Sequence, residues 1–384
     1  DKALIVIGRT AGEDRDYQAA EGSYLLTRQE RDMIRKVTAC FEKTVVVMNV
    51  SNIIDMSWLE EDYAHPVSGV IYVWQGGIEG GNAAADVLTG KVTPSGKLTD
   101  TIAWKLEDYP SHANYGSSRK NVHQEDIYVG YRYFDTFQVP VRYSFGYGLS
   151  YTDFSLKVMG IEHFDLGTDH PEIGVKVQVT NAGQRFSGRE VVQVYVSCPQ
   201  GKLPKEYRRL AGFQKTRLLA PGEMEEVVIR FSLAGLSSYR ESLPGWVLEE
   251  GTYGIFVGNS LDSSEFCGSL ELSEEIILER TRSVCPLRES LQEICPDEGK
   301  IRERRNAWKV EEHTVIHIQP ADVIGKTDVY GDGTDRISEK AREFAAGLSL
   351  EQLILLATGD PGMCQGSNLG SSGFSVPGSA AQTS

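Results

Sequence analysis

The chain has 384 residues, 40% of them hydrophobic and 24% charged, and its net charge is −15 because 54 acidic residues outnumber 39 basic ones. Such a balance is ordinary for a globular protein of two or three domains, and the acidic excess argues against a nucleic-acid-binding surface. No apolar run approaches the roughly 20 residues that a membrane span requires. We therefore expect neither nucleic acid nor a membrane among its partners.

The cysteines and the chain ends indicate the cellular context. Six cysteines are scattered without a Cys-x-x-Cys pair, which argues against a zinc knuckle and suits a reducing compartment as well as an oxidising one. The chain begins with Asp1 and enters a strand at once, with no visible secretory leader. We expect a cytoplasmic protein. Both ends look like those of a fragment or of one piece of a longer polypeptide.

The first predicted element is a buried strand from Ala3 to Ile7. It stops at Gly8 and opens into an acidic loop that carries Glu13. Because ligands bind at the carboxyl ends of strands in open α/β sheets, Glu13 stands where such a fold places working groups. A solvated acidic turn is the alternative, and the local pattern taken alone favours it.

The next elements predict a parallel sheet with helical crossovers. Thr27 and Glu30 form a capping box before a helix of about four turns. Strands are expected at residues 44–50 and 69–74, with a short helix at 55–58 between them. Strand alternating with helix is the pattern of a parallel α/β sheet.

A glycine-rich stretch, residues 76–81, follows the third strand and invites a nucleotide-binding interpretation. The dinucleotide fingerprint is absent, and Leu98 follows Lys97 where a P-loop requires Ser or Thr. We therefore expect these glycines to allow close packing of a helix at 82–89 that Gly90 ends. We expect Trp74 to belong to the core or to lie behind the site.

The segment Gly8-Arg9-Thr10-Ala11-Gly12-Glu13 resembles the acid/base loop of glycoside hydrolase family 3, the β-glucosidase family. Further segments resemble the α/β sandwich domain of that family in the same order: residues 74–82, 86–90, 94–98, 129–135 and 145–151. The resemblance implies that Glu13 protonates the leaving glycosidic oxygen. Arg9 and Asp16 are expected to hold the loop in shape, and a surface ion pair is the alternative for each. The aromatic and glycine-rich residues 129–151 predict an extended strap that joins this domain to the next.

From residue 153 the pattern changes to short strands separated by polar turns, and the strands are expected at residues 154–158, 173–179, 191–197, 226–231 and 254–257. This pattern predicts an antiparallel β-sandwich. Residues 179–183, 210–213 and 219–223 resemble the fibronectin type III domain of the same family, so this domain is expected to buttress the catalytic domains. Residues 261–337 are interpreted as an irregular or helical connector. Within it, residues 328–339 have part of the EF-hand spacing, but Tyr330 and Asp335 do not fit the calcium loop, so we expect a polar turn and no metal.

Two helices, from about 339 to 346 and from a capping box at Ser349 to Gly359, are predicted in the tail. This tail resembles the opening of the family's catalytic barrel, placed after the fibronectin-like domain in an inverted order. The predicted fold class is thus α/β plus β. It comprises an α/β sandwich domain (1–152), a β-sandwich (153–260), a connector (261–337) and the start of a (β/α)8-type barrel (338–384).

The resemblance implies part of a retaining β-glucosidase-like hydrolase that acts on a β-glucoside or oligosaccharide. Retaining glycosidases need two carboxyl groups, and the second would be an Asp of a barrel on the remainder of the polypeptide or on a separate chain. Asp14 and Asp16 lie too close to Glu13 in sequence to be favoured as nucleophiles. No cofactor is implied, and homo-oligomerisation is left open. The alternatives are a non-catalytic carbohydrate-binding or scaffold protein, a nucleotide-binding α/β protein, and β-xylosidase specificity within the family.

Overall fold

The computed structural model describes residues 1–9, 18–117, 119–283, 287, 289–325 and 338–357, together with 359, 360, 382 and 383. The described residues divide into two compact units. One contains residues 1–9 and 19–325, and the other contains the helices that follow residue 338. Each unit is described by itself.

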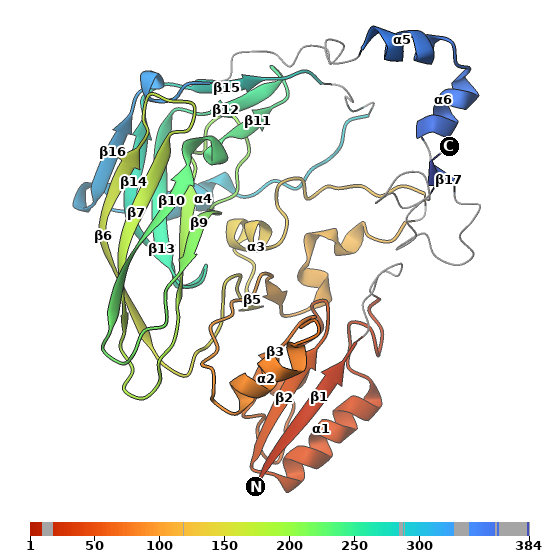
Figure 1. Ribbon diagram of the computed structural model, residues 1–384, viewed down its shortest axis with the longest axis vertical. Helices are drawn as coiled ribbons and strands as arrows, with labels where there is room; N and C mark the ends of the chain where they lie inside the picture. Colours follow the sequence, from red (N-terminus) through yellow and green to blue (C-terminus); the bar gives the residue numbers. More distant parts are fainter. Residues whose placement is uncertain are drawn as a thin grey trace. The chain divides into compact units, whose positions relative to one another are not determined.

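The first unit begins with a three-stranded parallel sheet, in the order β1-β2-β3 (Figure 1). Its strands and helices are β1 (Lys2–Gly8), α1 (Arg28–Cys40), β2 (Lys43–Asn49), η1 (Ser57–Glu60), β3 (Gly69–Tyr72) and α2 (Gly80–Leu88). The predicted strands, capping box and crossover helices are confirmed. Buried side chains from β1, β2 and α1 form the core of this layer, among them Ile7, Ile34 and Met48.

The segment after α2 differs in part from the predicted extended strap. Its elements are β4 (Ile102–Ala103), η2 (Leu106–Asp108), η3 (Pro110–Ala113), α3 (Tyr131–Phe137) and β5 (Val141–Tyr143). The prediction that residues 129–135 are not a regular element is wrong, because α3 buries Phe134 and Thr136 on one face. Gly130 and Gln138, both with positive φ, bound this short helix. Residues 144–151 carry no helix or strand, as predicted.

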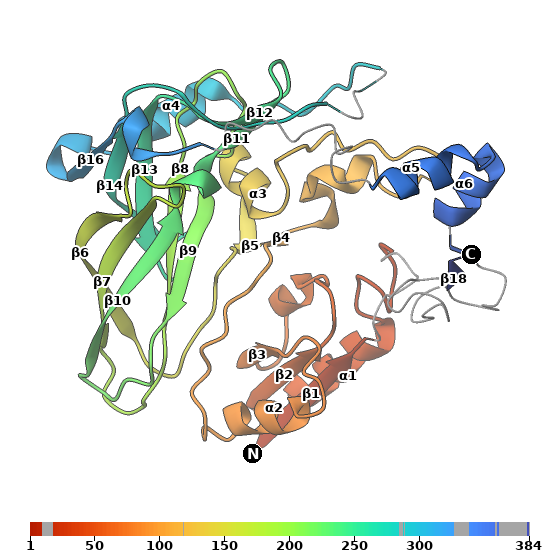
Figure 2. The same ribbon diagram turned by 45° about the horizontal axis from the view of Figure 1, so that its top comes forward.

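The β-sandwich is confirmed, with one sheet in the order β10-β7-β6 and a second in the order β16-β14-β13-β8-β9 (Figure 2). The predicted strands correspond to β6 (Phe154–Phe164), β7 (Glu172–Asn181), β8 (Val191–Ser197), β10 (Met224–Ser232) and β13 (Gly251–Gly258). Further elements are β9 (Arg209–Lys215), η4 (Leu233–Leu236), β11 (Ser238–Arg240), β12 (Gly245–Leu248) and β15 (Ile276–Arg280).

The sandwich continues beyond residue 260, into residues 261–337, for which an irregular or helical connector is predicted. Strand β14 (Glu265–Leu272) pairs with β13, and β16 (Thr314–Ile318) pairs with β14 in parallel. The helices of this region are α4 (Glu298–Asn306), η5 (Val310–Glu312) and η6 (Pro320–Asp322). Ile301 and Trp308 are buried against Tyr195 and Phe256 of the sandwich. Gly268 of β14 lies opposite Thr314 of β16, and a pairing between strands so far apart in sequence leaves no local periodic signal.

The second unit contains the two predicted tail helices. Helix α5 (Glu339–Ala346) begins at an N-cap serine, Ser338. Helix α6 (Leu350–Ala357) begins with reciprocal hydrogen bonds between Ser349 and Gln352, which confirms the predicted capping box. Two short strands, β17 (Gly359–Asp360) and β18 (Gln382–Thr383), pair antiparallel. Apart from Ser338 and Glu339, the weighed calcium loop (328–339) lies outside the described residues.

Candidate functional site

The carboxyl edge of the parallel sheet is where the sequence places the acid/base loop. The backbone N–H of Arg9 donates to Asn49 O at 3.1 Å and that of Val73 donates to Met48 O at 2.9 Å, so the three strand ends are aligned. The predicted Glu13 and Asp16 fall in residues 10–17, which lie outside the described residues. What the structure does describe is the base of this loop on both sides.

Arg9 lies at the base of the loop with its side chain only 8% exposed. Its guanidinium forms a bidentate ion pair with Glu30: Nη1 is 2.6 Å from Oε1 and Nη2 is 2.8 Å from Oε2. Nη1 also donates to Gly8 O at 2.9 Å. The predicted alternative of a surface ion pair does not describe this contact, since both partners are largely buried.

The same guanidinium also contacts the chain that follows the loop. Nε donates to Ser23 O and Nη2 donates to Leu25 O, each at 3.4 Å. The flanking Tyr24 and Leu26 are 6% and 1% exposed. Arg9 therefore joins the segment before residues 10–17, the segment after them and the first turn of α1.

Glu30 has a second task in the capping box of α1. Its Oε2 accepts from the Thr27 backbone N–H at 2.8 Å and from Thr27 Oγ1 at 3.1 Å. Burial alone raises the pKa of Glu30, but the hydrogen bonds from Arg9 and Thr27 outweigh burial and lower it. Glu30 is thus held as a carboxylate at neutral pH. The sequence revealed its cap role, whereas its pairing with Arg9, 21 residues away, leaves no local signal.

The end of β3 shows why its glycines are needed. Trp74 adopts a positive φ of 56°, and its ring centroid lies 4.4 Å from that of Tyr72. A Cβ on Gly76 would lie 2.6 Å from Gly80 Cα. The prediction of close helix packing is therefore confirmed at Gly76, and α2 begins two residues earlier than expected. Trp74 is half-buried, and its side chain packs beside the strand end.

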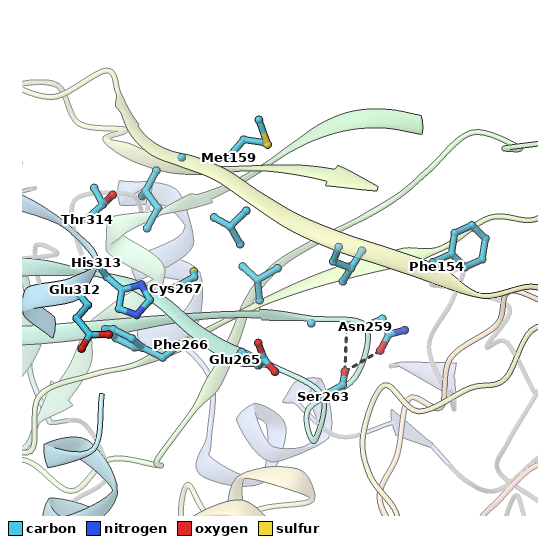
Figure 3. A pocket seen from close by; sticks show the side chains of 16 residues that line it. Phe154, Met159, Asn259, Ser263, Glu265, Phe266, Cys267, Glu312, His313 and Thr314 are labelled. Carbon is cyan, nitrogen blue, oxygen red and sulfur yellow. Dashed lines mark hydrogen bonds between the residues drawn. The ribbon is translucent and has the colours of Figure 1, made fainter. Parts of the chain in front are cut away.

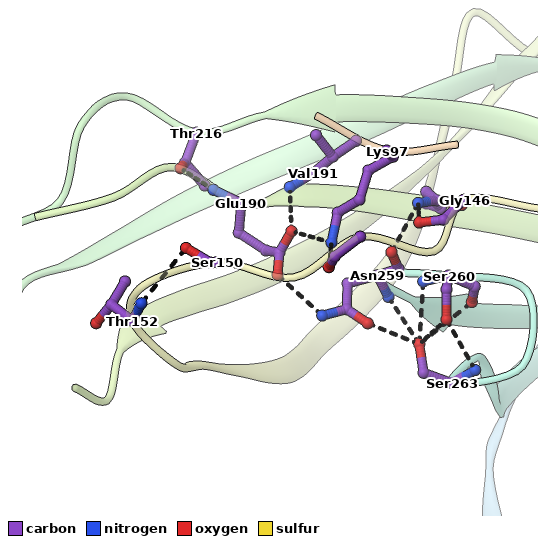
Figure 4. Close-up of polar contacts among 12 residues, drawn as sticks. Lys97, Gly146, Ser150, Thr152, Glu190, Val191, Thr216, Asn259, Ser260 and Ser263 are labelled. Atoms are coloured by element: carbon purple, nitrogen blue, oxygen red, sulfur yellow. Dashed lines mark hydrogen bonds and ion pairs between the residues drawn. The ribbon is translucent and has the colours of Figure 1, made fainter. Parts of the chain in front are cut away.

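Two observations argue against a phosphate site at these glycines. Glu79 precedes the first turn of α2, where its negative charge already complements the helix dipole. Lys97 is committed to Glu190 of the β-sandwich domain, with Nζ 2.9 Å from Oε1 and the two side chains 12% and 6% exposed. Figure 4 shows this pair, with Asn259 donating to the other oxygen of Glu190. Lys97 is a structural lysine and does not serve as a phosphate ligand.

The α/β domain and the sandwich are held together by a second buried ion cluster. Asp135 of α3 receives two hydrogen bonds from Arg208 and one from Arg304, all 2.8 Å long. Burial alone raises the pKa of Asp135, but the two arginines outweigh it and lower the pKa. Gln193 donates to Gly146 O at 3.3 Å, so the segment after β5 also contacts the sandwich, as predicted for the strap.

A cavity of about 630 Å³ opens in the sandwich, between β6 on one side and β13, β14 and the start of β16 on the other (Figure 3). Phe154 and Met159 line it from β6, and Glu265, Cys267 and His313 line it from the facing side. Burial raises the pKa of the Cys267 thiol to about 12, so this thiol is protonated and unreactive at neutral pH. The cavity lining contains no residue of the parallel sheet among those described.

Within the described ranges, no group of three or more His, Cys, Asp or Glu side chains has the arrangement that could hold a metal ion. The described helices also include none that is both long enough and apolar enough to cross a membrane.

Comparison with known proteins defines the class of each domain. Residues 1–151 match the glycosyl hydrolase family 3 C-terminal domain, and residues 190–261 match a fibronectin type III-like domain. The structure is similar to that of a β-glucosidase from Paenibacillus barengoltzii (TM-score 0.70, 47% identity, 73% of this chain and 32% of that one). It is also similar to β-glucosidase 3B from Thermotoga neapolitana in complex with glucose (TM-score 0.64, 40% identity, 72% of this chain and 38% of that one).

The chain thus carries the C-terminal domain of glycosyl hydrolase family 3, followed by a fibronectin type III-like domain. A β-glucosidase from Ruminococcus albus is 39% identical over 378 residues, covering 95% of this chain and 38% of that protein. β-Glucosidase A from Butyrivibrio fibrisolvens is 40% identical over 321 residues, covering 73% of this chain and 38% of that protein. The chain thus spans about two fifths of the length of these relatives. The match to the Ruminococcus protein also includes most of residues 262–384, which neither domain match reaches.

Proposed function

We propose that this chain is the part of a retaining β-glucosidase that supplies the general acid/base, Glu13, while the nucleophile is an Asp of a barrel outside these residues. The observation that carries the proposal is the position of Arg9. It directly follows Gly8, the last residue of β1, at the carboxyl edge of the sheet, and Glu13 comes four residues later in the segment that resembles the family's acid/base loop. The matches to proteins named β-glucosidase support the same assignment.

In the proposed reaction Glu13 works in both steps. First it donates its proton to the glycosidic oxygen while the barrel carboxylate attacks the anomeric carbon and the bond to the leaving group breaks. It then takes a proton from water as the water oxygen attacks the same carbon and releases the sugar and the nucleophile. The two carboxyl groups need to lie about 5–5.5 Å apart for this chemistry. No cofactor takes part.

The charges around the loop bear on the protonation of Glu13. A general acid has to remain protonated near neutral pH, which like-charged neighbours such as Asp14 and Asp16 favour and a free arginine opposes. The charge of Arg9 is balanced by Glu30 in a bidentate pair.

The test is Glu13→Gln in the enzyme assembled with its barrel. We expect kcat/KM on a glucoside with a poor leaving group to fall roughly 10²–10⁴-fold, the usual contribution of general acid catalysis. kcat/KM on an activated aryl glucoside should change little, because that leaving group departs without a proton. kcat on the activated substrate should fall, because the second step loses the base that activates water. Azide should restore this kcat, since an anionic nucleophile needs no base.

Glu21→Gln serves as the matched control, because Glu21 is an exposed carboxylate near the loop that accepts from the Arg28 backbone N–H. It should leave both substrates unaffected. Equal small losses on both substrates in Glu13→Gln would remove Glu13 from the acid role. An aryl β-xyloside measured beside the glucoside tests the alternative sugar specificity.

A further inference from the structure

We propose that Glu30 is a positioning residue, which acts through Arg9 to fix the base of the loop that carries the acid/base. This inference rests on the proposed function of Glu13. It concerns described residues only, namely Glu30, Arg9 and Thr27 and the backbone groups that Arg9 contacts. No part of the resemblance assigns Glu30 a role in the reaction.

The hydrogen bonds of the Arg9 guanidinium reach the chain on both sides of the loop. Its donors reach Gly8 O before residues 10–17, and Ser23 O and Leu25 O after them. Both chain segments that border the loop are therefore attached to one planar group. The orientation of that plane is set by Glu30, which binds it with two parallel hydrogen bonds.

Both oxygens of Glu30 bind Arg9, but only one of them also binds Thr27. Oε2 accepts from Thr27 and so caps α1, besides accepting from Arg9 Nη2. Oε1 accepts from Arg9 Nη1 at 2.6 Å. A glutamine fits a capping box as well as a glutamate does. The cap alone therefore does not require a carboxylate at position 30, whereas bidentate binding of a guanidinium does.

Burial limits the movement of the Arg9–Glu30 pair. Arg9 and Glu30 are 8% and 19% exposed, and Glu30 lies on a helix whose Ile34 is fully buried in the core. A bidentate pair between two largely buried side chains fixes the strand end relative to the helix. Because a displacement of about 1 Å at a reacting group can reduce the rate about 100-fold, loss of this attachment should affect catalysis more than folding.

The experiment is Glu30→Gln in the assembled enzyme, with Glu61→Gln as the matched control. Glu61 also binds arginines of α1, with Arg31 Nη1 at 2.8 Å and Arg35 Nη2 at 2.7 Å, but it does not contact Arg9. We expect Glu30→Gln to lower kcat/KM about 10-fold or more on a poor leaving group and less than about 3-fold on an activated aryl glucoside. Glu61→Gln should lower both equally and slightly, and KM for the poor substrate should change little in either variant.

Two further variants separate positioning from general stability. Arg9→Lys keeps the charge but not the two-pronged geometry, and it should reproduce the leaving-group-dependent loss. In the Glu13→Gln background, adding Glu30→Gln should cause no further loss on the poor leaving group, because residues that act as a unit are not additive.

The outcomes distinguish this inference from the proposed function. If Glu13→Gln shows the leaving-group dependence and Glu30→Gln lowers both substrates equally, or lowers neither, the positioning role is overturned while the acid role stands. A further loss in the double variant equal to that of Glu30→Gln alone would also overturn it. If Glu13→Gln itself shows no leaving-group dependence, the proposed function fails first.

Discussion

Two arginine–carboxylate clusters use the same chemistry for different ends. Arg9 and Glu30 join the two borders of one loop to a helix, whereas Asp135, Arg208 and Arg304 join α3 to the sandwich and to α4. In both clusters the arginines lower the carboxylate pKa against the effect of burial. The difference lies in what each cluster attaches. Arginine pairing alone therefore does not indicate a site, and what distinguishes the first cluster is that its contacts converge on the base of a loop.

Asp135→Ala removes the only carboxylate of the Asp135–Arg208–Arg304 cluster, and we expect it to have the largest effect on stability. It leaves Arg208 and Arg304 without their carboxylate, and Arg208 is only 10% exposed in this pair. Removing one partner of a buried pair costs about 3–5 kcal/mol, so we expect a loss of this size in the free energy of unfolding, measured with urea. The leaving-group dependence of catalysis should be unchanged in the fraction that remains folded.

The control for Asp135→Ala is Glu226→Ala, which removes an exposed ion pair with Lys176. Exposed pairs contribute about 0–1 kcal/mol, so this variant should be nearly neutral. Similar losses in the free energy of unfolding would contradict the claim that the Asp135 cluster stabilises the protein more than an exposed ion pair does.

Gly146→Ala tests the contact between the segment after β5 and the sandwich, and its effect on stability should be intermediate. Gly146 has φ +78°, and an added Cβ would meet the side-chain amide of Gln193. Gly222 has φ +77°, but no atom lies within 4 Å of an added Cβ. We expect a loss of about 2–4 kcal/mol for Gly146→Ala, which combines backbone strain with overpacking, and about 1–2 kcal/mol for Gly222→Ala. Equal losses on urea unfolding would show that the contact with Gln193 contributes nothing.

The smallest expected effect is the pH dependence of the free energy of unfolding that Glu30 and Asp135 contribute. Both clusters should contribute to it in the same direction. The folded pKa values of Glu30 and Asp135 lie below the ordinary values of 4.5 and 3.8. The unfolded chain therefore binds protons first, and the stability from these groups is full above the ordinary pKa and is lost as the pH falls through the lowered one. Unfolding free energies measured from pH 7 down to pH 3 should fall less steeply in Glu30→Gln than in the wild type. If the free energy of unfolding fell as steeply with pH in Glu30→Gln as in the wild type, the lowered pKa of Glu30 would be contradicted.

Local patterns were sufficient to predict β1–β3, α1 and the sandwich strands β6–β8, because each has a clear apolar period or capping box. They failed for α3, whose aromatic residues indicated a strap, and for β14 and β16, whose pairing depends on distant partners. The contacts of Lys97 with Glu190 and of Arg9 with Glu30 link residues far apart in sequence, and such pairs leave no local trace. Arg9 was predicted as a residue that shapes the loop, whereas Glu30 was recognised only as a helix cap.

The central claim is that this chain supplies the acid/base and that the nucleophile lies elsewhere. The most direct test is hydrolysis of a chromogenic aryl β-glucoside by this chain alone, beside the same chain joined to a family 3 barrel. The account predicts activity only in the joined form. Full activity of the chain alone would mean that both carboxyl groups lie within these 384 residues, and it would contradict the assignment of the nucleophile to the barrel.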